Sequence, residues 1–327
     1  MKKLNYLFFL LFFCISFAQN VQFVNKQNIP VEGVVLIDNH GKMVGSTDIG
    51  GNVPQQNLDK SDFVILSHPS LEQDTIYIKD IKNNRVIVNP IREQKITEVA
   101  IKNSDKEYLT ITGYFNTYIT NNGEFNGFVD GIMETVIDRK TNKVKDNIIK
   151  EYRSFILEKK EETTKEVSSM VFEMNKTPKL NSLTNAISKE GKFKLTNSIN
   201  NEIIAQYKKS LFTEKELKLF GYRLFNENLL ESFVFSDNKI QPKNLVFYKC
   251  EISMDVKHKS EEKYNRLNIF TNFYPNEISF KNKNELEKGV KFDREKSQVK
   301  TKYWEDENNA GIYKILAAQF KENFKQQ

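Results

Sequence analysis

Apolar and polar residues alternate along much of the chain, and this period of two predicts a protein built mainly from β-strands. Before residue 90 the apolar runs are short and are separated by Gly, Pro, Asn and Asp. The expected strands there cover residues 21–24, 31–37, 42–46, 63–67, 75–81 and 85–88. Short strands at this spacing are typical of a small sandwich of two antiparallel sheets.

The two sheets of such a sandwich would share one apolar core, because each sheet alone has a single apolar face. The pattern selects nine candidates for this core, namely Val31, Val35, Ile37, Val64, Leu66, Ile76, Ile78, Val86 and Val88.

A second series of strands begins after residue 105. In the first of them, aliphatic residues and Phe115 alternate with Tyr108, Tyr114 and Tyr118, so one face is apolar and the other carries tyrosines. Asn122-Gly123 is a strong hairpin signal, and it predicts return strands over residues 125–137 and 144–157. Further strands are expected over residues 246–256 and 267–273, with a turn at Pro275-Asn276 and another strand over 277–281.

Helices are expected between these two groups of strands. Leu180, Leu183 and Ile187 share a helical face, and a similar spacing predicts a helix over residues 199–211. Thr213 and Glu216 form a capping box that would begin a helix ending at Gly221. A last helix is expected over residues 312–324. The predicted fold class is therefore α+β and β-rich, with an N-terminal sandwich followed by a larger antiparallel-sheet domain containing a few helices.

The first 18 residues have the features of a secretory signal peptide. Lys2 and Lys3 precede an apolar run that is too short to span a bilayer, and Ala18 is a suitable cleavage point. A lipoprotein signal ending at Cys14 is the alternative, although the bulky Phe13 before it is atypical. The expected organisation is a signal peptide over 1–18, a β-sandwich over 19–91, a polar connector, and an α+β domain of unknown function over 105–327.

The N-terminal sandwich also carries a family resemblance. The pattern Pro30-Val-x-Gly33-Val-x-Leu36, the Gly45-Ser-Thr-Asp48 turn with Gly51, and 63–69 resemble the carboxypeptidase regulatory-like domain, which is a transthyretin-like sandwich common in Bacteroidetes envelope proteins. The chain departs from the family at Asn52–Pro54, where an aromatic strand residue is usual. The resemblance implies an accessory, non-catalytic module.

The second region carries a similar resemblance. The phrases Gly113-Tyr-Phe, Phe128-Val-Asp-Gly-Ile and Glu151-Tyr-Arg-Ser resemble uncharacterised Bacteroidetes proteins that share this N-terminal domain. This resemblance implies a cell-envelope address, in the periplasm or associated with the outer membrane or cell surface, and it implies no known activity.

Charge and cysteine content exclude several classes of protein. The formal charge is +6, or +4 without Lys2 and Lys3, which is too small and too evenly mixed with acids to indicate nucleic-acid binding. Cys250 is the one cysteine left after signal cleavage, so no internal disulfide is expected. No later segment approaches the length of about 18 apolar residues needed for a transmembrane helix.

The sequence contains no complete catalytic set. His258 and Glu261 match the HxxE pair of zinc carboxypeptidases, but the other histidines, His40 and His68, lie upstream in the N-terminal region. We therefore expect no bound metal, no cofactor and no enzymatic activity. A hydrolase of unknown type is the one exception that remains. His68 is expected to be a polar residue at the sandwich rim, and Cys250 to be a buried thiol.

Tyr108, Tyr114 and Tyr118 are the candidate ligand-binding residues. Aromatic side chains in a row can stack on a sugar or an apolar ligand, but the same row also packs across strands in ordinary sheets, which we favour. Asp130-Gly131 is expected to mark a bulge rather than a ligand-binding acid.

Two functions are consistent with these patterns. The first is a secreted, non-catalytic envelope protein that binds or scaffolds an envelope protein, a glycan or an apolar ligand. The alternative is a periplasmic carrier of lipid or another apolar ligand, in which the C-terminal domain forms a half-barrel lined by Phe115, Tyr248 and Ile269 with the central helices as a lid.

Overall fold

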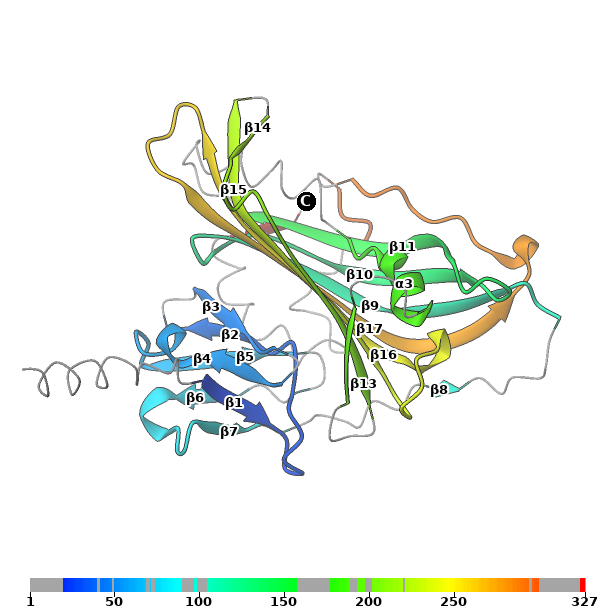
Figure 1. Ribbon diagram of the computed structural model, residues 1–327, viewed down its shortest axis with the longest axis horizontal. Coiled ribbons are helices and arrows are strands. Elements are labelled where there is room, and N and C mark those ends of the chain that lie inside the picture. The colour runs from blue at the N-terminus through cyan, green and yellow to red at the C-terminus, as the bar shows by residue number, and fades with distance from the viewer. Residues whose placement is uncertain are drawn as a thin grey trace, which may run out of the picture.

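The protein is β-rich and contains several sheets, as Figure 1 shows for the computed structural model. The structure describes residues 20–39, 42–48, 50–68, 71, 74–89, 97–98, 105–157, 177–188, 193–197, 202–219, 221–293, 296–299 and 324–326. The predicted signal peptide, the part of the predicted C-terminal helix before Phe324 and most of the polar connector between residues 91 and 105 lie outside these residues.

Two small sheets occupy the N-terminal region, which we define as residues 20–89. One sheet has the order β4-β1-β7, with β1 Asn20–Val24, β4 Asn52–Pro54 and β7 Arg85–Ile87. The other has the order β3-β2-β5-β6, with β2 Val35–Asp38, β3 Met43–Ser46, β5 Phe63–Ser67 and β6 Thr75–Tyr77. Short 3-10 turns cover Gln55–Asn57 and Ile78–Asp80. The strand expected over 75–81 therefore ends at Tyr77.

The two small sheets share an apolar cluster. Of the predicted core residues, Val64, Leu66, Val86 and Val88 are buried in it, and Val31, Ile76 and Ile78 pack against it while partly exposed. Val35 and Ile37 were predicted wrongly, because they belong to a different cluster on the outer face of β2. Successive side chains of a strand point to opposite faces, and Val34 and Leu36 occupy the inner face.

The departure from the family pattern at Asn52–Pro54 does not remove the local strand. These residues form β4, which pairs antiparallel with β1, and Val53 is fully buried. Gly51 precedes the strand with a φ of +70°, and a Cβ there would lie 2.3 Å from the carbonyl oxygen of Phe23. Only glycine allows this close approach of the two backbones.

An eleven-stranded sheet makes up most of the described structure after residue 89. Its strand order is β12-β13-β15-β16-β17-β9-β10-β11-β18, while β14 pairs with β15 and β8 pairs in parallel with β17. The strands are β8 Thr97–Glu98, β9 Tyr108–Asn121, β10 Glu124–Asp138, β11 Val144–Leu157, β12 Lys194–Asn197, β13 Ile203–Leu211, β14 Leu217–Leu219, β15 Tyr222–Phe235, β16 Leu245–His258, β17 Asn265–Lys281 and β18 Phe324–Gln326. We call this the large sheet.

Two strand meanders that are distant in sequence join to form the large sheet. Strands β9, β10 and β11 follow one another, as do β15, β16 and β17, and the antiparallel pairing of β17 with β9 connects the two groups. The hairpin predicted at Asn122-Gly123 is confirmed, with φ values of 50° and 86°. Positive φ at both central residues is the requirement of the type I′ turn, which matches the twist of the flanking strands.

Three predicted elements of the large sheet are wrong. Residues 203–211 form strand β13 rather than a helix, because a spacing of four residues keeps Ile203, Tyr207 and Leu211 on one face of a strand as well. The segment after Thr213 leads into strand β14 instead of a capped helix, and strand β15 was not predicted. Strand β17 continues through Pro275 with a register shift, since a bulge accommodates the missing N–H of proline.

A single short α-helix lies in the described part of the chain. Helix α3, Leu183–Ser188, follows a 3-10 turn at Leu180–Ser182, which confirms the helix predicted around Leu183. Leu180, Leu183 and Ala186 are buried in the main apolar cluster together with residues from one face of the large sheet. We call this side of the large sheet the helix face. No helix in the described residues is long and apolar enough to cross a membrane.

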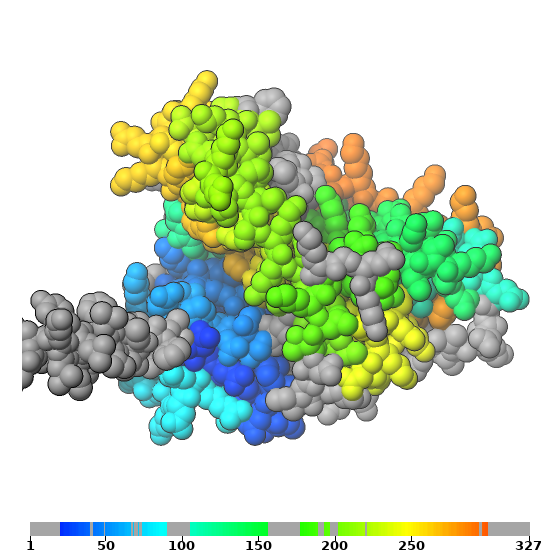
Figure 2. Space-filling model, viewed as in Figure 1, coloured from blue at the N-terminus to red at the C-terminus, as the bar shows by residue number. Residues whose placement is uncertain are grey.

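The N-terminal region packs against the opposite side of the large sheet, which we call the N-terminal face (Figures 1 and 2). Val35, Ile37 and Met43 from β2 and β3 form one cluster with four buried aromatic residues of the large sheet, namely Tyr118, Phe125, Phe128 and Phe155. The amide N–H of Met43 also donates to the carbonyl oxygen of Gly123, 3.1 Å away. The outer face of β2 is therefore an apolar surface for docking on the large sheet.

Candidate binding site

A row of polar side chains crosses the N-terminal face, one from each of six neighbouring strands. The strand registers place six residues directly opposite one another, namely Ser232, Lys249, Asn272, Asn116, Asp130 and Arg153. Each of these residues is at most 5% exposed. We call them the polar row. Buried polar groups need partners, so the contacts of this row determine what the N-terminal face can hold.

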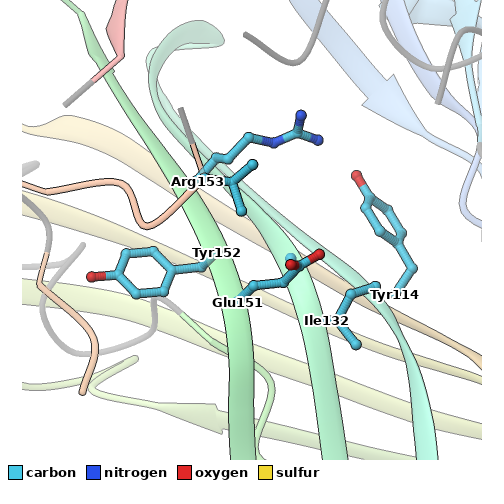
Figure 3. A pocket seen from close by; sticks show the side chains of 7 residues that line it. Tyr114, Ile132, Glu151, Tyr152 and Arg153 are labelled. Carbon is cyan, nitrogen blue, oxygen red and sulfur yellow. The ribbon is translucent and has the colours of Figure 1, made fainter. Parts of the chain in front are cut away.

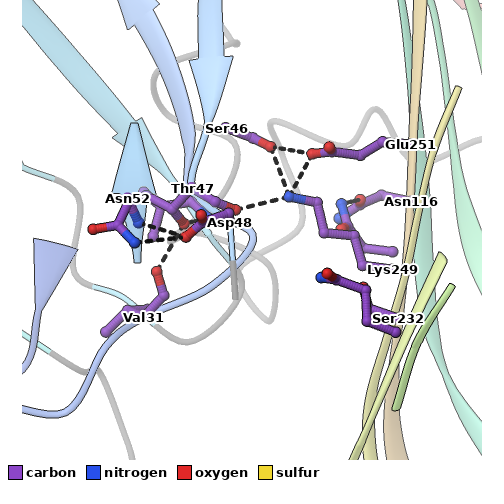
Figure 4. A network of polar contacts seen from close by, with 12 residues as sticks. Val31, Ser46, Thr47, Asp48, Asn52, Asn116, Ser232, Lys249 and Glu251 are labelled. Atoms are coloured by element: carbon purple, nitrogen blue, oxygen red, sulfur yellow. Dashed lines mark hydrogen bonds and ion pairs between the residues drawn. The ribbon is translucent and has the colours of Figure 1, made fainter. Parts of the chain in front are cut away.

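Lys249 joins the polar row to the N-terminal region (Figure 4). Its Nζ donates to the hydroxyl of Ser46 at 2.9 Å and to the carbonyl oxygen of Thr47 at 2.7 Å, and it lies 2.5 Å from a carboxylate oxygen of Glu251. Ser46 in turn donates to the same Glu251 oxygen at 2.9 Å. The three protons of the ammonium group thus have three acceptors, two of them on the N-terminal region.

Thr47 is held in position from its own side of this contact. Its hydroxyl donates to the carbonyl oxygen of Val31 at 2.7 Å and accepts from the amide of Val34 at 2.9 Å. The turn that meets Lys249 is therefore fixed within the N-terminal region, and Lys249 contacts a preformed acceptor.

A second group of titratable residues lies beside this contact. Burial raises the pKa of Glu32 to about 7, and the nearby Glu202 carboxylate adds to this effect while Lys249 opposes it. Burial lowers the pKa of His68 to about 4, partly offset by a hydrogen bond with the backbone of Glu32. The imidazole ring meets the edge of the Tyr274 ring, with centroids 5.7 Å apart. His68 is therefore a buried residue at the junction with the large sheet, which corrects the expected rim position.

In the middle of the polar row, the side-chain amide of Asn272 donates to Asn116 Oδ1 at 2.8 Å. The Oδ1 atom of Asn272 is buried and has no hydrogen-bond partner among the described residues. Gly33 lies above it with a φ of +72°, and a Cβ there would be 3.1 Å from the Phe247 ring. A glycine at this position therefore lets the N-terminal region approach the polar row closely.

Asp130 and Arg153 form the other end of the polar row. Arg153 donates from Nε and Nη2 to the two carboxylate oxygens of Asp130, at 2.9 and 2.5 Å. The hydroxyl of Tyr114 donates to Asp130 Oδ2 at 3.2 Å. This two-bond pairing fixes both side chains, because a guanidinium and a carboxylate match in shape and charge.

An open pocket lies at this end of the polar row (Figure 3). Its lining residues are Tyr114, Gly131, Ile132, Glu151, Tyr152, Arg153 and Val299, and its empty volume, open solvent included, is about 310 Å³. In Figure 3 the side chain of Tyr152 points away from the other labelled side chains. The wall available to a ligand therefore consists of a tyrosine, an arginine, a glutamate, an isoleucine, a valine and backbone.

Gly131 brings the strands together at the floor of this pocket. A Cβ on Gly131 would lie 2.1 Å from the carbonyl oxygen of Glu151. A bulge was expected at Asp130-Gly131. The shift in register between β10 and β11 lies instead between Ile132 and Met133. Asp130 itself is paired with Arg153, as described above.

No family model and no curated protein matches the chain.

The structure places only one of the three predicted binding tyrosines at the pocket. Tyr114 lines it, whereas Tyr118 is 1% exposed and packs against Phe125 and Phe128 under the N-terminal region. Tyr108 begins β9 and pairs with Asp138 and Lys281, away from the pocket.

Lys249, Asp130 and Arg153 were not identified from the sequence as site residues. The alternation in β16 correctly placed Lys249 on the polar face of its strand, but that pattern alone is typical of a solvated face. The pairing of Asp130 with Arg153 depends on the register between β10 and β11, which a single sequence does not specify.

The other candidate chemical groups have structural partners. The amide of His258 donates to Glu261 Oε2 at 2.8 Å, and its Nδ1 lies 2.6 Å from the hydroxyl of Ser260, within one hairpin connection. Burial raises the pKa of the Cys250 thiol to about 12, which disfavours the reactive thiolate. No three His, Cys, Asp or Glu residues of the described chain are grouped so that they could hold a metal ion.

The helix face carries a small polar cluster of its own. The carboxylate of Glu231 accepts from the hydroxyl of Tyr248 at 3.0 Å and from Ser182 Oγ at 2.5 Å. Burial raises the pKa of Glu231 above its ordinary value. Phe115, Tyr248 and Ile269, which were predicted to line a half-barrel, are buried in the surrounding apolar cluster, each at most 2% exposed. Among the described residues they form packed core beneath α3.

Proposed function

We propose that this chain is a secreted, non-catalytic protein of the cell envelope that binds or scaffolds another envelope component. In this proposal the two N-terminal sheets form a carboxypeptidase regulatory-like sandwich, and the large sheet forms a second domain against which the sandwich is fixed. The protein would act in the periplasm or in association with the outer membrane or cell surface.

The docking of the N-terminal region on the large sheet is the observation that carries the proposal. An apolar cluster and the buried Lys249 contact join the two parts, so they present one continuous surface rather than two independent modules. A pocket opens on this surface beside the junction. A rigid support with a shallow open pocket suits binding, because little of the binding free energy is then lost in ordering the side chains of the site.

The chemistry of the described residues supports a non-catalytic role. A nucleophile needs an adjacent base that activates it, and a catalytic zinc needs three protein ligands with an open position. Cys250 is kept protonated by burial, and His258 is engaged within a short charged hairpin. Neither group therefore has the surroundings that catalysis requires.

Export and the absence of catalysis can be tested together. The chain would be expressed with its leader in a bacterium with two membranes, and the cell fractions would be analysed by intact mass and N-terminal sequencing. We expect cleavage after Ala18 and recovery in the periplasmic or envelope fraction. Retention in the cytoplasm with the leader intact would contradict the proposal, as would zinc-dependent hydrolysis that disappears in His258→Ala and Glu261→Gln variants.

A carrier of lipid or another apolar ligand is the second candidate, favoured by the position of residues 180–188 over an apolar sheet face. Because Phe115, Tyr248 and Ile269 are packed there, a ligand would have to displace the helix. Titration with a fluorescent fatty acid tests this function. Saturable binding that is weakened by Ile269→Trp would support it, and an absence of binding with delipidated protein would contradict it.

A further inference from the structure

We propose that a projecting arm of the large sheet attaches the protein to the surface of an anionic phospholipid bilayer. We define the arm as residues 212–225 and 256–265, which contain β14, the beginning of β15 and the hairpin connection between β16 and β17. The inference rests on the proposed envelope location and names the envelope component that is bound. It is drawn from the shape, the exposed apolar residues and the charges of the arm.

The arm projects from the body of the protein as a paired β-structure. Figure 1 shows β14 and the β16–β17 connection extending beyond the rest of the large sheet, and in Figure 2 their side chains stand out from the surface. Strand β15 pairs with both β14 and β16 in this region. The amide of Lys259 also donates to the carbonyl oxygen of Gly221 at 2.9 Å, which joins the two hairpins at their tips. The backbone that carries the arm's side chains is therefore preformed.

Large apolar side chains are exposed on the arm. Six such side chains are exposed among the described residues, and half of them belong to the arm, namely Leu217, Leu219 and Tyr264. Leu217 and Leu219 lie opposite Leu224 and Tyr222 of β15. Leu224 belongs to the main apolar cluster and Tyr222 packs against it, so the two leucines extend the apolar helix face to an outer strand. Apolar residues that are grouped and exposed in this way are typical of an interaction surface.

The other side of the same strands is basic. Lys218, Arg223 and Lys257 lie directly opposite one another on β14, β15 and β16. Like charges in opposite positions destabilise a sheet. Among the described residues, Glu216 is the one carboxylate that pairs with this row, 3.8 Å from Arg223. The row therefore keeps an excess of positive charge, which an anionic partner would offset.

The arm as a whole has a net charge of +2, because it contains six basic and four acidic residues. Two of the acids are held by neighbours within the arm. Glu216 accepts from the hydroxyl of Tyr264, and Glu261 accepts from the amide of His258 at 2.8 Å. Four exposed lysines form no ion pair within the described part of the chain, namely Lys215, Lys218, Lys259 and Lys263. Their ammonium groups are available to anions outside the protein.

A bilayer with anionic headgroups suits both sides of the arm. Leucine side chains are stabilised when they leave water for the boundary between headgroups and acyl chains. Lysine side chains beside them can keep their ammonium groups at the level of the phosphates, where anionic lipids attract them. Tyrosine is enriched at this boundary, because its ring is apolar and its hydroxyl is polar. A protein partner fits less well, since lysine is depleted in protein–protein interfaces.

Vesicle flotation tests the inference with the purified chain lacking residues 1–18, because an apolar leader would itself bind lipid. One set of vesicles is phosphatidylcholine alone, and the other contains about one third phosphatidylglycerol, which is anionic. We expect the chain to float with the anionic vesicles and to bind the neutral ones at least about tenfold more weakly. Added salt should release it, because salt screens the attraction between lysines and phosphates.

Two double variants change the two sides of the arm separately. Leu217→Ser with Leu219→Ser should weaken binding to the anionic vesicles about tenfold, because it removes the apolar contact. Lys218→Gln with Lys259→Gln should weaken it by about the same factor and leave binding to the neutral vesicles unchanged. All four side chains are exposed, so both variants should melt close to the unchanged chain.

Matched controls make the same kinds of change in the N-terminal region. Ile87→Ser removes a side chain that is 57% exposed, and Lys26→Gln with Lys60→Gln removes two exposed lysines. The two lysine variants lose the same net charge, so a general attraction of a basic protein to anionic lipid would weaken equally in both. We expect the controls to bind within about twofold of the unchanged chain.

Three results would overturn the inference: no flotation with the anionic vesicles, equal weakening in the control variants, or unaltered binding in both arm variants. A dimer that is dissociated by the leucine variant, in a chain that does not float, would also overturn it, because a second copy would then cover the leucines. The fractionation experiment separates these failures from that of the proposed function. A chain that is exported and cleaved but does not float would contradict only the membrane attachment. A chain that floats but is retained in the cytoplasm would contradict only the proposed function.

Discussion

At the scale of single residues, Lys249 is the side chain whose loss should cost the most stability on the N-terminal face. It is 2% exposed, and it bonds to Ser46, Thr47 and Glu251. Lys249→Met should lower the free energy of unfolding by about 3 kcal/mol, because Glu251 loses its cationic partner and keeps only the Ser46 hydroxyl, and the Thr47 carbonyl keeps only the amide of Gly33.

Urea unfolding followed by circular dichroism measures this change. The exposed Lys208→Met, on strand β13 of the same sheet, is the matched control and should change the free energy of unfolding by no more than about 0.5 kcal/mol. If both variants have the same midpoint, Lys249 contributes nothing beyond an ordinary surface lysine, and the docking described above must depend on the apolar cluster alone.

Glu32 and His68 should make stability depend on pH in opposite directions. The pKa of Glu32 is raised from 4.5 to about 7 in the folded chain, so the folded state binds more protons and Glu32 lowers stability as the pH rises through this interval. The pKa of His68 is lowered from 6.5 to about 4, so the unfolded state binds more protons and His68 raises stability as the pH rises through that interval. The two effects oppose each other where the intervals overlap.

A variant that lacks one of the two groups should therefore show the pH dependence of stability that the other group causes. Relative to the unchanged chain, Glu32→Gln should gain stability as the pH rises from 4.5 to 7, and His68→Gln should lose relative stability as the pH rises from 4 to 6.5. Melting temperatures measured at half-unit steps from pH 4 to 8 give both curves. Curves that run parallel to that of the unchanged chain would show that neither group has a shifted pKa.

At the scale of elements, helix α3 is held on the sheet by apolar packing and by hydrogen bonds from the helix and the turn before it. Ser182, just before the helix, donates to the buried carboxylate of Glu231. Ser182→Ala removes a hydrogen bond to a carboxylate that lies in an apolar environment, which should cost about 1–3 kcal/mol. We expect faster amide hydrogen exchange over residues 180–188, with the exchange of β16 and β17 unchanged. Ser188→Ala, at the exposed end of the helix, should leave the exchange of this segment unaltered.

The elements with unambiguous periodicity were predictable from the sequence. The alternation in β9 and β16 is compatible only with a strand, and Asn122-Gly123 is compatible only with a tight hairpin turn. The structure confirms these elements. Residues 203–211 were ambiguous, because a spacing of four satisfies both a helix and a strand. The docking face of β2 was not predictable either, since Val35 and Ile37 are as apolar as Val34 and Leu36. The presence of a second sheet decided which pair faces outward.

The candidate site was less predictable than the fold for the same physical reason. Tyr114 was identified because aromatic residues on a strand face are visible in the sequence. Asp130, Arg153 and Lys249 become a row only when six strands adopt one register, and β17 must pair with β9 across a sequence separation of about 150 residues. Cross-strand neighbours of this kind follow from long-range pairing, which local patterns do not encode.

At the scale of the whole molecule, the N-terminal region and the large sheet should unfold as one unit. The cluster containing Val35, Ile37 and Met43 is continuous with Tyr118 and Phe128, so separating the two parts would expose apolar area on both. Calorimetry should give a single transition whose van't Hoff and calorimetric enthalpies agree.

Ile37→Asp places a charge in this cluster without altering the inner core, and it should split the melt into two transitions. The matched control Ile87→Asp, at a side chain that is 57% exposed, should retain one transition. Two transitions in the unchanged chain would mean that the parts are stable separately, and the rigid support on which the proposed binding function rests would then be absent.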